Sequence, residues 1–488
     1  MEKKSYIVGV DIGSSNVVVA VGERLPNGLV RVDGVASRPV PDGVTAGHID
    51  NVRSVGKAIC DAKTELEEEL GIRIDSAYAG ISGNFVRCAG YTDHVFIDGP
   101  MGCITKDDVA RLHERMGSVK ADDGEQIIDR IPQCYMVDDG KEIADPVGAF
   151  GRKLSATFLF VLCRKEQIER VKMSFFNAGG LKLLGICVNP AVLPMALLSD
   201  EERDEGVAVI DLGGGTTDVA IVRGGTLRYI ASIPIGASSI NDDMHAFGIA
   251  ERNTEQIKRK YGSAVADKVS PDDIVPVQMP RMMKKALLQV NLVAVIEARL
   301  KDIIEFAWDE IRSAKFSSKI PCGIVLTGGA ALLENIDELF SRETGVSVRL
   351  GKAAYGIDEE SQQNIGTYSH STAVAVLLFG AEHGVCSAVG HSAPAANRAG
   401  HSVEPAPKPE TVVRPTEPAK EPVVEPVKPA PQAARPVEQT VEPVDNTPAA
   451  QDYDDEEEHE GKRGGGLLGR LSNFIDKMLG TDKEKEYL

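Results

Sequence analysis

Asp211-Leu-Gly-Gly-Gly-Thr-Thr-Asp218, followed by Val219-Ala-Ile-Val222, is the stretch of this sequence that decides its fold. Asp11-Ile-Gly-Ser-Ser-Asn16, followed by a valine-rich run, repeats the same plan of strand, acidic residue, glycine turn and strand. Glycines let backbone amides approach an anion, and hydroxyl groups can donate to phosphate oxygens. Two such hairpins that face each other would grip a polyphosphate. The predicted phosphate-binding residues are Gly13, Ser14, Ser15, Asn16, Gly213, Gly214, Gly215, Thr216 and Thr217.

An aspartate precedes each glycine turn, Asp11 in the first hairpin and Asp211 in the second. Mg²⁺ keeps most of its waters and prefers one or two carboxylates together with phosphate oxygens. The two aspartates are therefore predicted to belong to the nucleotide site and to hold Mg²⁺ through its water ligands. No GxxxxGK motif occurs, which excludes a P-loop NTPase. A literal GxGxxG at 464–469 follows an acidic run and not a strand, so it does not indicate a dinucleotide-binding turn.

These hairpins resemble the phosphate motifs of the actin, Hsp70 and sugar-kinase superfamily. Gly323-Ile-Val-Leu-Thr-Gly-Gly-Ala-Ala-Leu-Leu333 resembles the turn that packs against adenosine in the same superfamily. The resemblance implies an actin-like, two-lobed α/β ATPase fold that binds ATP and Mg²⁺. It also implies which residues lie near the base and ribose: Gly328, Gly329, Ala330, Glu255 and Lys258. The last two lie one helical turn apart, so an ordinary solvent-exposed ion pair is the alternative interpretation.

The residue that would orient the attacking water is Asn189. In the superfamily a Gln or Glu ahead of the second hairpin has this role, and the matching segment here is Gly185-Ile-Cys-Val-Asn-Pro-Ala191. An amide positions water but cannot act as a base. We therefore expect nucleotide binding with weak ATPase activity at most.

Composition separates a globular body from a different C-terminal tail. The net charge of -19 excludes a nucleic-acid-binding protein, because phosphate neutralisation needs clustered Lys and Arg. The eight cysteines are scattered without a CxxC pair, as in a reducing cytosol. No signal peptide is recognisable, and no run approaches the ~20 apolar residues that span a bilayer. A cytoplasmic protein without a transmembrane helix is expected.

Short β-branched runs alternate with helical periodicity up to about residue 390, which favours α/β layers. The clearest strands cover 6–10, 17–21, 157–162, 207–210 and 219–222, and helices are predicted over 106–116 and 284–311. The predicted parts are lobe 1 (1–83, 166–190 and 365–390), an inserted small domain (84–165), the core of lobe 2 (191–240 and 314–364), its helical subdomain (241–313), a disordered Pro-rich and acidic linker (391–461) and an amphipathic membrane-targeting helix (462–488).

The C-terminal tail is predicted to combine a disordered linker with an amphipathic helix. Half of the 26 prolines fall between residues 393 and 448, a composition that cannot bury enough surface to fold. Beyond it, apolar residues recur at helical spacing beside cations, which suits an anionic bilayer surface. A protein groove is the alternative partner. The predicted membrane-binding residues are Leu467, Leu468, Arg470, Leu471, Phe474, Ile475, Lys477, Met478 and Leu479.

Within the superfamily, three features resemble the FtsA family of bacterial division proteins. They are the block from Gly213 to Leu227 with Ile233-Pro-Ile-Gly236 and Val295-Ile-Glu-Ala-Arg-Leu300, the inserted domain, and the terminal helix after a linker. The resemblance implies a peripheral protein on the cytoplasmic face of the cell membrane at the division site. It would polymerise with copies of itself, anchor the tubulin-like ring protein FtsZ and help to recruit later division proteins.

By similarity, Arg281 and Arg299 would meet the acidic C-terminal peptide of FtsZ, and solvent-exposed charges are the alternative interpretation. Three other functions of the same fold stay open. A small-molecule kinase would need a carboxylate base and a substrate cleft. An Hsp70-like chaperone would need a substrate-binding β-domain after the ATPase body. An MreB-like membrane filament protein would lack the insert and the tether.

Overall fold

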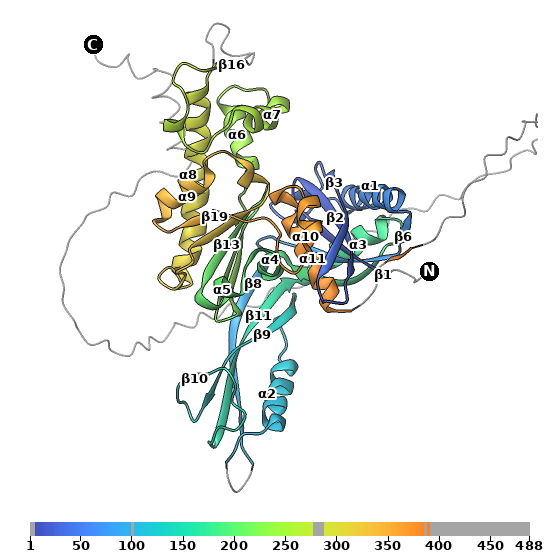
Figure 1. Cartoon of the computed structure of the whole chain (residues 1–488), viewed down its shortest axis with the longest axis vertical. Coiled ribbons are helices and arrows are strands. Elements are labelled where there is room, and N and C mark those ends of the chain that lie inside the picture. Colours follow the sequence, from blue (N-terminus) through green and yellow to red (C-terminus); the bar gives the residue numbers. More distant parts are fainter. Residues whose placement is uncertain (1–4, 99–101, 277–286, 385–387, 391–488) are drawn as a thin grey trace, which may run out of the picture. The chain divides into compact units, whose positions relative to one another are not determined.

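The computed structural model describes residues 5–98, 102–276, 287–384 and 388–390 (Figure 1). The chain divides into one unit from Met1 to Pro394 and a second from Ala395 to Leu488. The second unit lies entirely outside the described residues, and with it lie the predicted linker and the predicted membrane helix.

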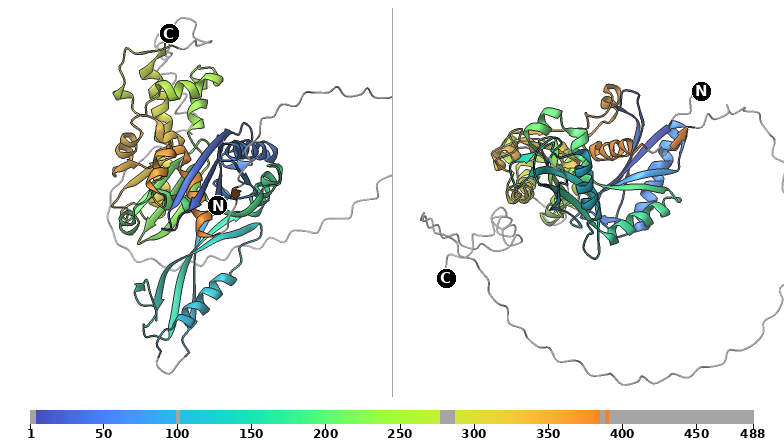
Figure 2. Two further views of the ribbon diagram at one scale, coloured as in Figure 1. Left: turned by 45° about the vertical axis from the view of Figure 1, so that its right-hand side comes forward. Right: turned by 90° about the horizontal axis from the view of Figure 1, so that it is seen from below.

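Lobe 1 is built on a seven-stranded sheet that contains the N-terminal hairpin. Its order is β12-β7-β1-β2-β3, and β20 joins β1 to β6. The central strands are valine-rich and buried on both faces, because helices cover both sides. α1 packs with α3 on one face, and α4 packs with α11 on the other (Figure 2). The strands are β1 (Ser5–Ile12), β2 (Asn16–Arg24), β3 (Val30–Pro39), β6 (Ile72–Ile74), β7 (Ser76–Ile81), β12 (Lys182–Val188) and β20 (Ala388–Gly390), and the helices are α1 (Val52–Leu70), α3 (Lys165–Asn177), α4 (Asn189–Leu197) and α11 (Ser371–Glu382).

Lobe 2 is built on a five-stranded sheet in the order β15-β14-β13-β18-β19. The second glycine turn joins β13 to β14, and β13 runs parallel to β18. The lobe has its own core of Ile, Leu and Val side chains, in which α8 takes a large share. The strands are β13 (Val207–Leu212), β14 (Thr217–Arg223), β15 (Thr226–Ile233), β18 (Ile324–Thr327) and β19 (Val348–Leu350), and the helices are α5 (Asp200–Glu205), α8 (Gln289–Ser313), α9 (Ile336–Thr344) and α10 (Glu359–Asn364), the last of which contacts β3 of lobe 1.

A helical block stands at one end of lobe 2. It consists of α6 (Ser238–Ala246), α7 (Glu251–Tyr261), the first half of α8 and a short ladder of β16 (Ile274–Val275) with β17 (Leu287–Leu288). The predicted helix over 284–311 is confirmed in part. α8 begins only at Gln289, because the two preceding leucines pair with β16, and it continues to Ser313; residues 284–286 lie outside the described residues.

The chain between β7 and α3 forms a small separate layer of one sheet and one helix. Its sheet has the order β10-β9-β11-β8, and α2 packs on it over a core that contains Leu112, Met116 and Phe158. A capping box of Thr105 and Asp108 starts α2. The elements are β8 (Val86–Phe96), α2 (Lys106–Ser118), β9 (Glu125–Val137), β10 (Glu142–Ile143) and β11 (Lys153–Arg164).

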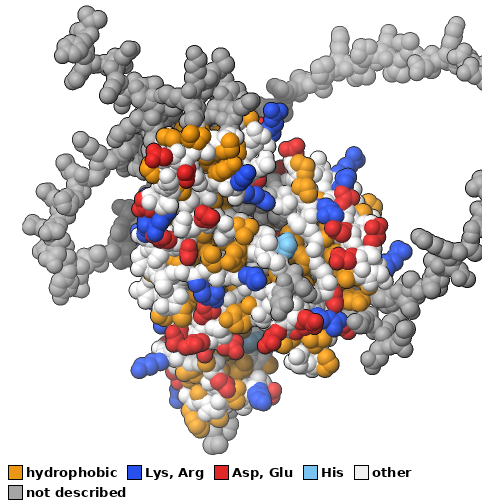
Figure 3. Space-filling view, turned by 45° about the horizontal axis from the view of Figure 1, so that its top comes forward, with side chains coloured by type: hydrophobic (Ala, Val, Ile, Leu, Met, Phe, Trp, Pro, Cys, Tyr) orange, Lys and Arg blue, Asp and Glu red, His pale blue; other side chains and the backbone are white. Residues whose placement is uncertain are grey.

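The actin-like, two-lobed α/β fold with an inserted small layer is thus confirmed. No helix among the described residues is long and apolar enough to cross a membrane. Acidic and basic side chains are interspersed over the face in Figure 3, and the described part of that face shows no broad field of Lys and Arg.

Candidate functional site

The two glycine turns meet each other. Each is closed by the same kind of backbone bond, from Gly13 N to Asn16 O (3.1 Å) and from Gly213 N to Thr216 O (2.9 Å). A β-carbon on Gly214 would lie 2.0 Å from Ser15 Oγ, so no other residue type allows this approach. Likewise, a β-carbon on Gly215 would lie 2.5 Å from Ser14 Oγ. The structure therefore brings the two predicted turns together. Thr217, however, is fully buried, and its hydroxyl group donates to the carbonyl of Ile235 (2.8 Å), so it is not free to donate to a phosphate.

Three buried carboxylates lie directly beneath the turns. Asp211 is opposite Asp218 in the β13–β14 ladder, so the two acids share one face of the sheet, and Asp11 approaches from lobe 1. Burial, followed by the nearby charge of Asp211, raises the pKa of Asp11 to about 7 and that of Asp218 to about 8. Burial also raises the pKa of Asp211. Burial thus favours the protonated forms of these acids, and a cation that entered the site would favour their ionised forms.

Neutral side chains donate hydrogen bonds to all three carboxylates, and Asp218 receives one from Ser82 as well as one from Ser232. Asn189 Nδ2 donates to Asp11 Oδ1 (2.8 Å), Thr372 Oγ1 donates to Asp211 Oδ2 (2.8 Å), and Ser232 Oγ donates to Asp218 Oδ1 (2.5 Å). Within the described residues, none of the three forms an ion pair with Lys, Arg or His. Because buried charge requires a counter-charge, this donor set fits a cation held near the carboxylates.

Asn189, the residue expected to orient water, is the first residue of α4 and is 4% exposed. Its amide nitrogen is committed to Asp11, as described above. Its Oδ1 is buried and has no hydrogen-bond partner among the residues that the structure describes. A free acceptor beside the phosphate turns is compatible with holding a water, and that role stays a prediction.

The predicted ribose residues occupy α7. Lys258 Nζ lies 2.8 Å from Glu255 Oε2 and donates to the carbonyl of Ala237 (3.0 Å), the residue before α6. Burial acts to raise the pKa of Glu255, but the adjacent ammonium group of Lys258 overrides it and lowers that pKa to about 2. Lys258 is only 9% exposed, whereas the side chain of Glu255 is 47% exposed, so the i,i+3 pair is half-buried. Contact with ribose stays a prediction.

The third predicted motif reaches the carboxylates from β18. Gly328 has φ +95°, and a β-carbon there would lie 2.3 Å from Asp211 Oδ1. Gly329 and Ala330 begin a short 3₁₀ turn over Gly329–Leu332. The glycine pair thus lets the end of β18 turn closely past the end of β13, which places the predicted adenosine segment beside the predicted Mg²⁺ carboxylates.

The two arginines that are predicted to bind an acidic peptide lie in different parts of the chain. Arg281 lies outside the described residues. Arg299, on α8, binds Asp243 of α6 through two contacts of 2.5 and 2.9 Å, and its side chain is 11% exposed. Its charge is therefore already neutralised within the chain. Arg299 is thus ion-paired between α8 and α6 and is not a solvent-exposed charge, and its contact with an acidic peptide stays a prediction.

Sequence reasoning did not select Asp218, Thr372 and Ser232. Asp218 ends the second motif, and its register opposite Asp211 follows from the tight turn, so the sequence contained a signal for it. Thr372 stands 161 residues from the aspartate that it contacts, and Ser232 lies on the next strand. No local pattern marks either of these hydroxyl groups.

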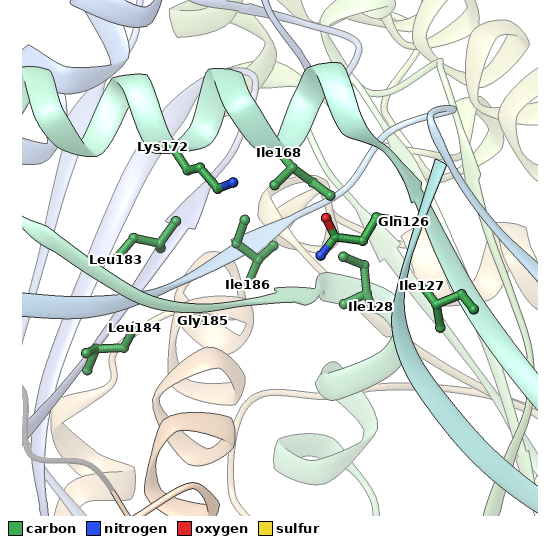
Figure 4. A pocket seen from close by; sticks show the side chains of 9 residues that line it. All are labelled: Gln126, Ile127, Ile128, Ile168, Lys172, Leu183, Leu184, Gly185 and Ile186. Atoms are coloured by element: carbon green, nitrogen blue, oxygen red, sulfur yellow. The ribbon is translucent and has the colours of Figure 1, made fainter. Parts of the chain in front are cut away.

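A separate cavity of about 260 Å³ lies between β9, α3 and β12 (Figure 4). Ile168 and Lys172 project toward it from α3, above the side chains of β12. None of the three carboxylates lines it. Its lining residues are Gln126, Ile127, Ile128, Ile168, Lys172, Leu183, Leu184, Gly185 and Ile186.

The chain is similar to known cell division proteins. A family model described as "Cell division protein FtsA" matches residues 208–375, and one described as "SHS2 domain inserted in FTSA" matches residues 85–162. The chain is 30% identical to the cell division protein FtsA of Escherichia coli strain K12 over 390 residues, which cover 78% of this chain and 91% of that protein. It is 29% identical to FtsA of Bacillus subtilis strain 168 over 358 residues, 73% of this chain and 80% of that one.

Among solved structures, a chain of the PilM-PilN type IV pilus biogenesis complex is similar with a TM-score of 0.53. The two chains share 16% identity, and the match covers 77% of this chain and 98% of the other, which is a likeness of fold alone. The matches to the body and to the insert decide against the kinase, chaperone and MreB-like alternatives. This chain belongs to the FtsA family of cell division proteins.

Proposed function

We propose that this chain binds ATP and Mg²⁺ in the clamp, polymerises into actin-like filaments at the cytoplasmic face of the cell membrane, and tethers the FtsZ ring there. The observation that carries the nucleotide part is the meeting of two glycine turns over three buried carboxylates, for which the described part of the chain supplies no cationic partner. Backbone amides and hydroxyl groups suit phosphate oxygens, while the carboxylates suit the hydrated cation that accompanies them.

Asp11 and Asp211 are the residues that would hold Mg²⁺, with Asp218 as a third carboxylate behind them. Within the described residues, no group of three or more His, Cys, Asp or Glu side chains is arranged to bind a metal directly. Contact through water ligands fits this donor set, because Mg²⁺ dehydrates reluctantly. When bound, the ion would neutralise phosphate charge. Asn189 and Thr372 keep the carboxylates oriented for this contact.

Slow turnover follows from the same geometry. The residue placed to orient a water, Asn189, already donates its amide to Asp11 and offers only an acceptor oxygen. An amide cannot take the proton of the attacking water. The nucleotide would therefore act mainly as a structural ligand that sets the state of the filament, with hydrolysis weak.

Membrane attachment rests on the C-terminal sequence, which lies outside the described residues. Its apolar residues recur at helical spacing next to Arg470 and Lys477, and a basic residue near an anionic surface contributes about 1 kcal/mol. Family membership supports the partners: further copies of the chain, the C-terminal peptide of FtsZ and later division proteins.

The proposal is tested by sedimentation with anionic vesicles, Mg²⁺-ATP and a fluorescent FtsZ C-terminal peptide. Three chains are compared: the intact chain, one truncated after Gly461, and one carrying Phe474→Glu. We expect the intact chain to pellet with the peptide, and both variants to stay in solution while still binding the peptide. Binding of ATP by all three, measured by calorimetry, controls for folding. Vesicle binding that survives both changes would contradict the membrane anchor, and an intact chain that leaves the peptide in solution would contradict the tether.

A further inference from the structure

A short hairpin of lobe 1 contacts the first phosphate turn from the side. It consists of β4 (Val44–Thr45) and β5 (His48–Ile49), which pair antiparallel around a two-residue turn of Ala46 and Gly47. We infer that Gln167 and Arg170 of α3 are positioning residues for the nucleotide phosphates, because they anchor this hairpin and the hairpin orients Ser14. The inference rests on the proposed binding of ATP.

The tip of the hairpin controls the direction of the Ser14 hydroxyl group. Gly47 N donates to Ser14 Oγ at 3.0 Å. A serine hydroxyl has one proton to donate and two lone pairs to accept with, so this bond occupies an acceptor position and leaves the proton free. A phosphate oxygen between the turns could then accept this proton. A β-carbon on Gly215 would lie 3.0 Å from Ala46 N, so the second phosphate turn touches the same tip.

The hairpin tip is strained and closely surrounded. Ala46 has φ +48° and Gly47 has φ +82°, and a left-handed conformation costs a non-glycine residue roughly 1 kcal/mol. A β-carbon on Gly47 would lie 2.1 Å from the carbonyl oxygen of Ser82, so the tip fits in one position only. A two-stranded hairpin of this length is not stable by itself. Its position must therefore be fixed from outside.

Helix α3 supplies that anchor at the base of the hairpin. Arg170 Nη1 donates to the carbonyl oxygen of Ile49 at 2.5 Å, and Ile49 N donates to Gln167 Oε1 at 3.3 Å. Both backbone polar groups of one residue are thus held by side chains of one helix. Gln167 is 1% exposed, so water cannot easily replace its bond.

The anchoring helix is also tied to the inserted layer. α3 begins where β11 ends, and Lys165 N donates to the carbonyl of Gly124 just before β9 (2.8 Å). Ile168 and Lys172 of α3 project into the cavity bounded by β9 and β12 (Figure 4). One helix therefore contacts the insert with some residues and the phosphate hairpin with others. A shift of the insert would reach the phosphate turn through Ile49.

The test compares ATP with AMP, which lacks the β- and γ-phosphates, by calorimetry on the full chain with Mg²⁺. Arg170→Gln should weaken ATP about fivefold, the value of one lost hydrogen bond, and change AMP by less than about twofold. Arg170→Lys should restore most of the ATP affinity, because its ammonium group can still donate to Ile49 O. Lys172→Gln, which breaks an exposed pair on the same helix, is the matched control and should change neither ligand.

A double-mutant cycle with Ser14→Ala separates positioning from general loosening. If α3 acts through Ser14, Arg170→Gln should have no further effect on ATP in the Ser14→Ala background. Equal losses for ATP and AMP, an unchanged ATP affinity, or additive effects in the cycle would each overturn the inference. If Arg170→Gln does not fold by circular dichroism, Gln167→Leu, which removes the acceptor of Ile49 N, takes its place in the same cycle. Wild-type protein that fails to bind ATP would instead contradict the proposed function.

Discussion

The nucleotide-free protein should be less stable at pH 8 than at pH 6, because of its buried acids. Burial and mutual repulsion give Asp11 a pKa of about 7 and Asp218 a pKa of about 8 in the folded chain, against 3.8 when unfolded. Between pH 4 and pH 7 the folded protein therefore holds protons that the unfolded chain has released. Stability must fall as pH rises through this range, since ionisation favours the unfolded state.

The size of the effect follows from these pKa values. From pH 6 to pH 8, Asp11 should lower the free energy of unfolding by about 1.4 kcal/mol and Asp218 by about 2.3 kcal/mol. The combined loss is about 4 kcal/mol. The Asp218→Asn variant carries a neutral amide at every pH. Its free energy of unfolding should therefore fall between pH 6 and pH 8 only by the contribution of Asp11. Mg²⁺ with ATP should reduce the loss in the wild type, because a cation stabilises the ionised carboxylates.

Trp308 provides the assay. It is the only tryptophan of the chain and lies on α8, which packs on β14, the strand of Asp218. Urea unfolding followed by its fluorescence at pH 6 and pH 8 gives the four free energies for wild type and Asp218→Asn. The reasoning is refuted if the wild type is equally stable at both pH values, or if Asp218→Asn loses as much stability as the wild type.

Three further predictions concern single contacts. Gly328→Ala should cost about 2 kcal/mol or more of stability in urea unfolding and weaken Mg²⁺-ATP at least about tenfold by calorimetry, because its β-carbon would meet Asp211 Oδ1 at 2.3 Å and its φ is +95°; normal binding would contradict the close packing. Arg299→Met should lower the unfolding free energy by about 3–5 kcal/mol, since it leaves Asp243 buried without its partner; a loss below about 1 kcal/mol would show an exposed pair. Thr372→Val should weaken Mg²⁺-ATP about fivefold with little loss of fold, because it removes the donor to Asp211; unchanged affinity would show that this hydroxyl does not orient the carboxylate.

The parts of the site that the sequence predicts are local in the chain. Each phosphate hairpin occupies no more than twenty residues, and its strand, acid and glycine turn are all set by short-range geometry. Its register follows from the turn, which is why the hairpins and their aspartates are found where they were expected. Gly328 belongs to the same class, because a strand that ends in two glycines indicates a close approach whatever lies opposite.

The parts that the sequence does not predict depend on distant packing. Arg299 has the same local pattern whether it faces solvent or Asp243, and only the packing of α8 on α6 decides. Helix periodicity could not place the start of α8 either, because the two leucines before Gln289 satisfy a helical pattern while their backbone pairs with β16. Tertiary contacts override such local preferences.

Two helices cross between the lobes, and their first residues hold the two predicted Mg²⁺ carboxylates. α4 begins with Asn189 at Asp11 of lobe 1, but its body packs on β13, β14 and β15 of lobe 2. α11 begins with Ser371 and Thr372 at Asp211 of lobe 2, but its body packs on β1, β2 and β7 of lobe 1, and the two helices also pack on each other. Helix N-termini favour negative charge, so both helix ends gain when these acids ionise. Entry of a cation would therefore shift both crossing helices together. Through these helices it would change the orientation of one lobe relative to the other. Under the proposed function, a nucleotide that is hydrolysed slowly would in this way still set the shape of a filament subunit.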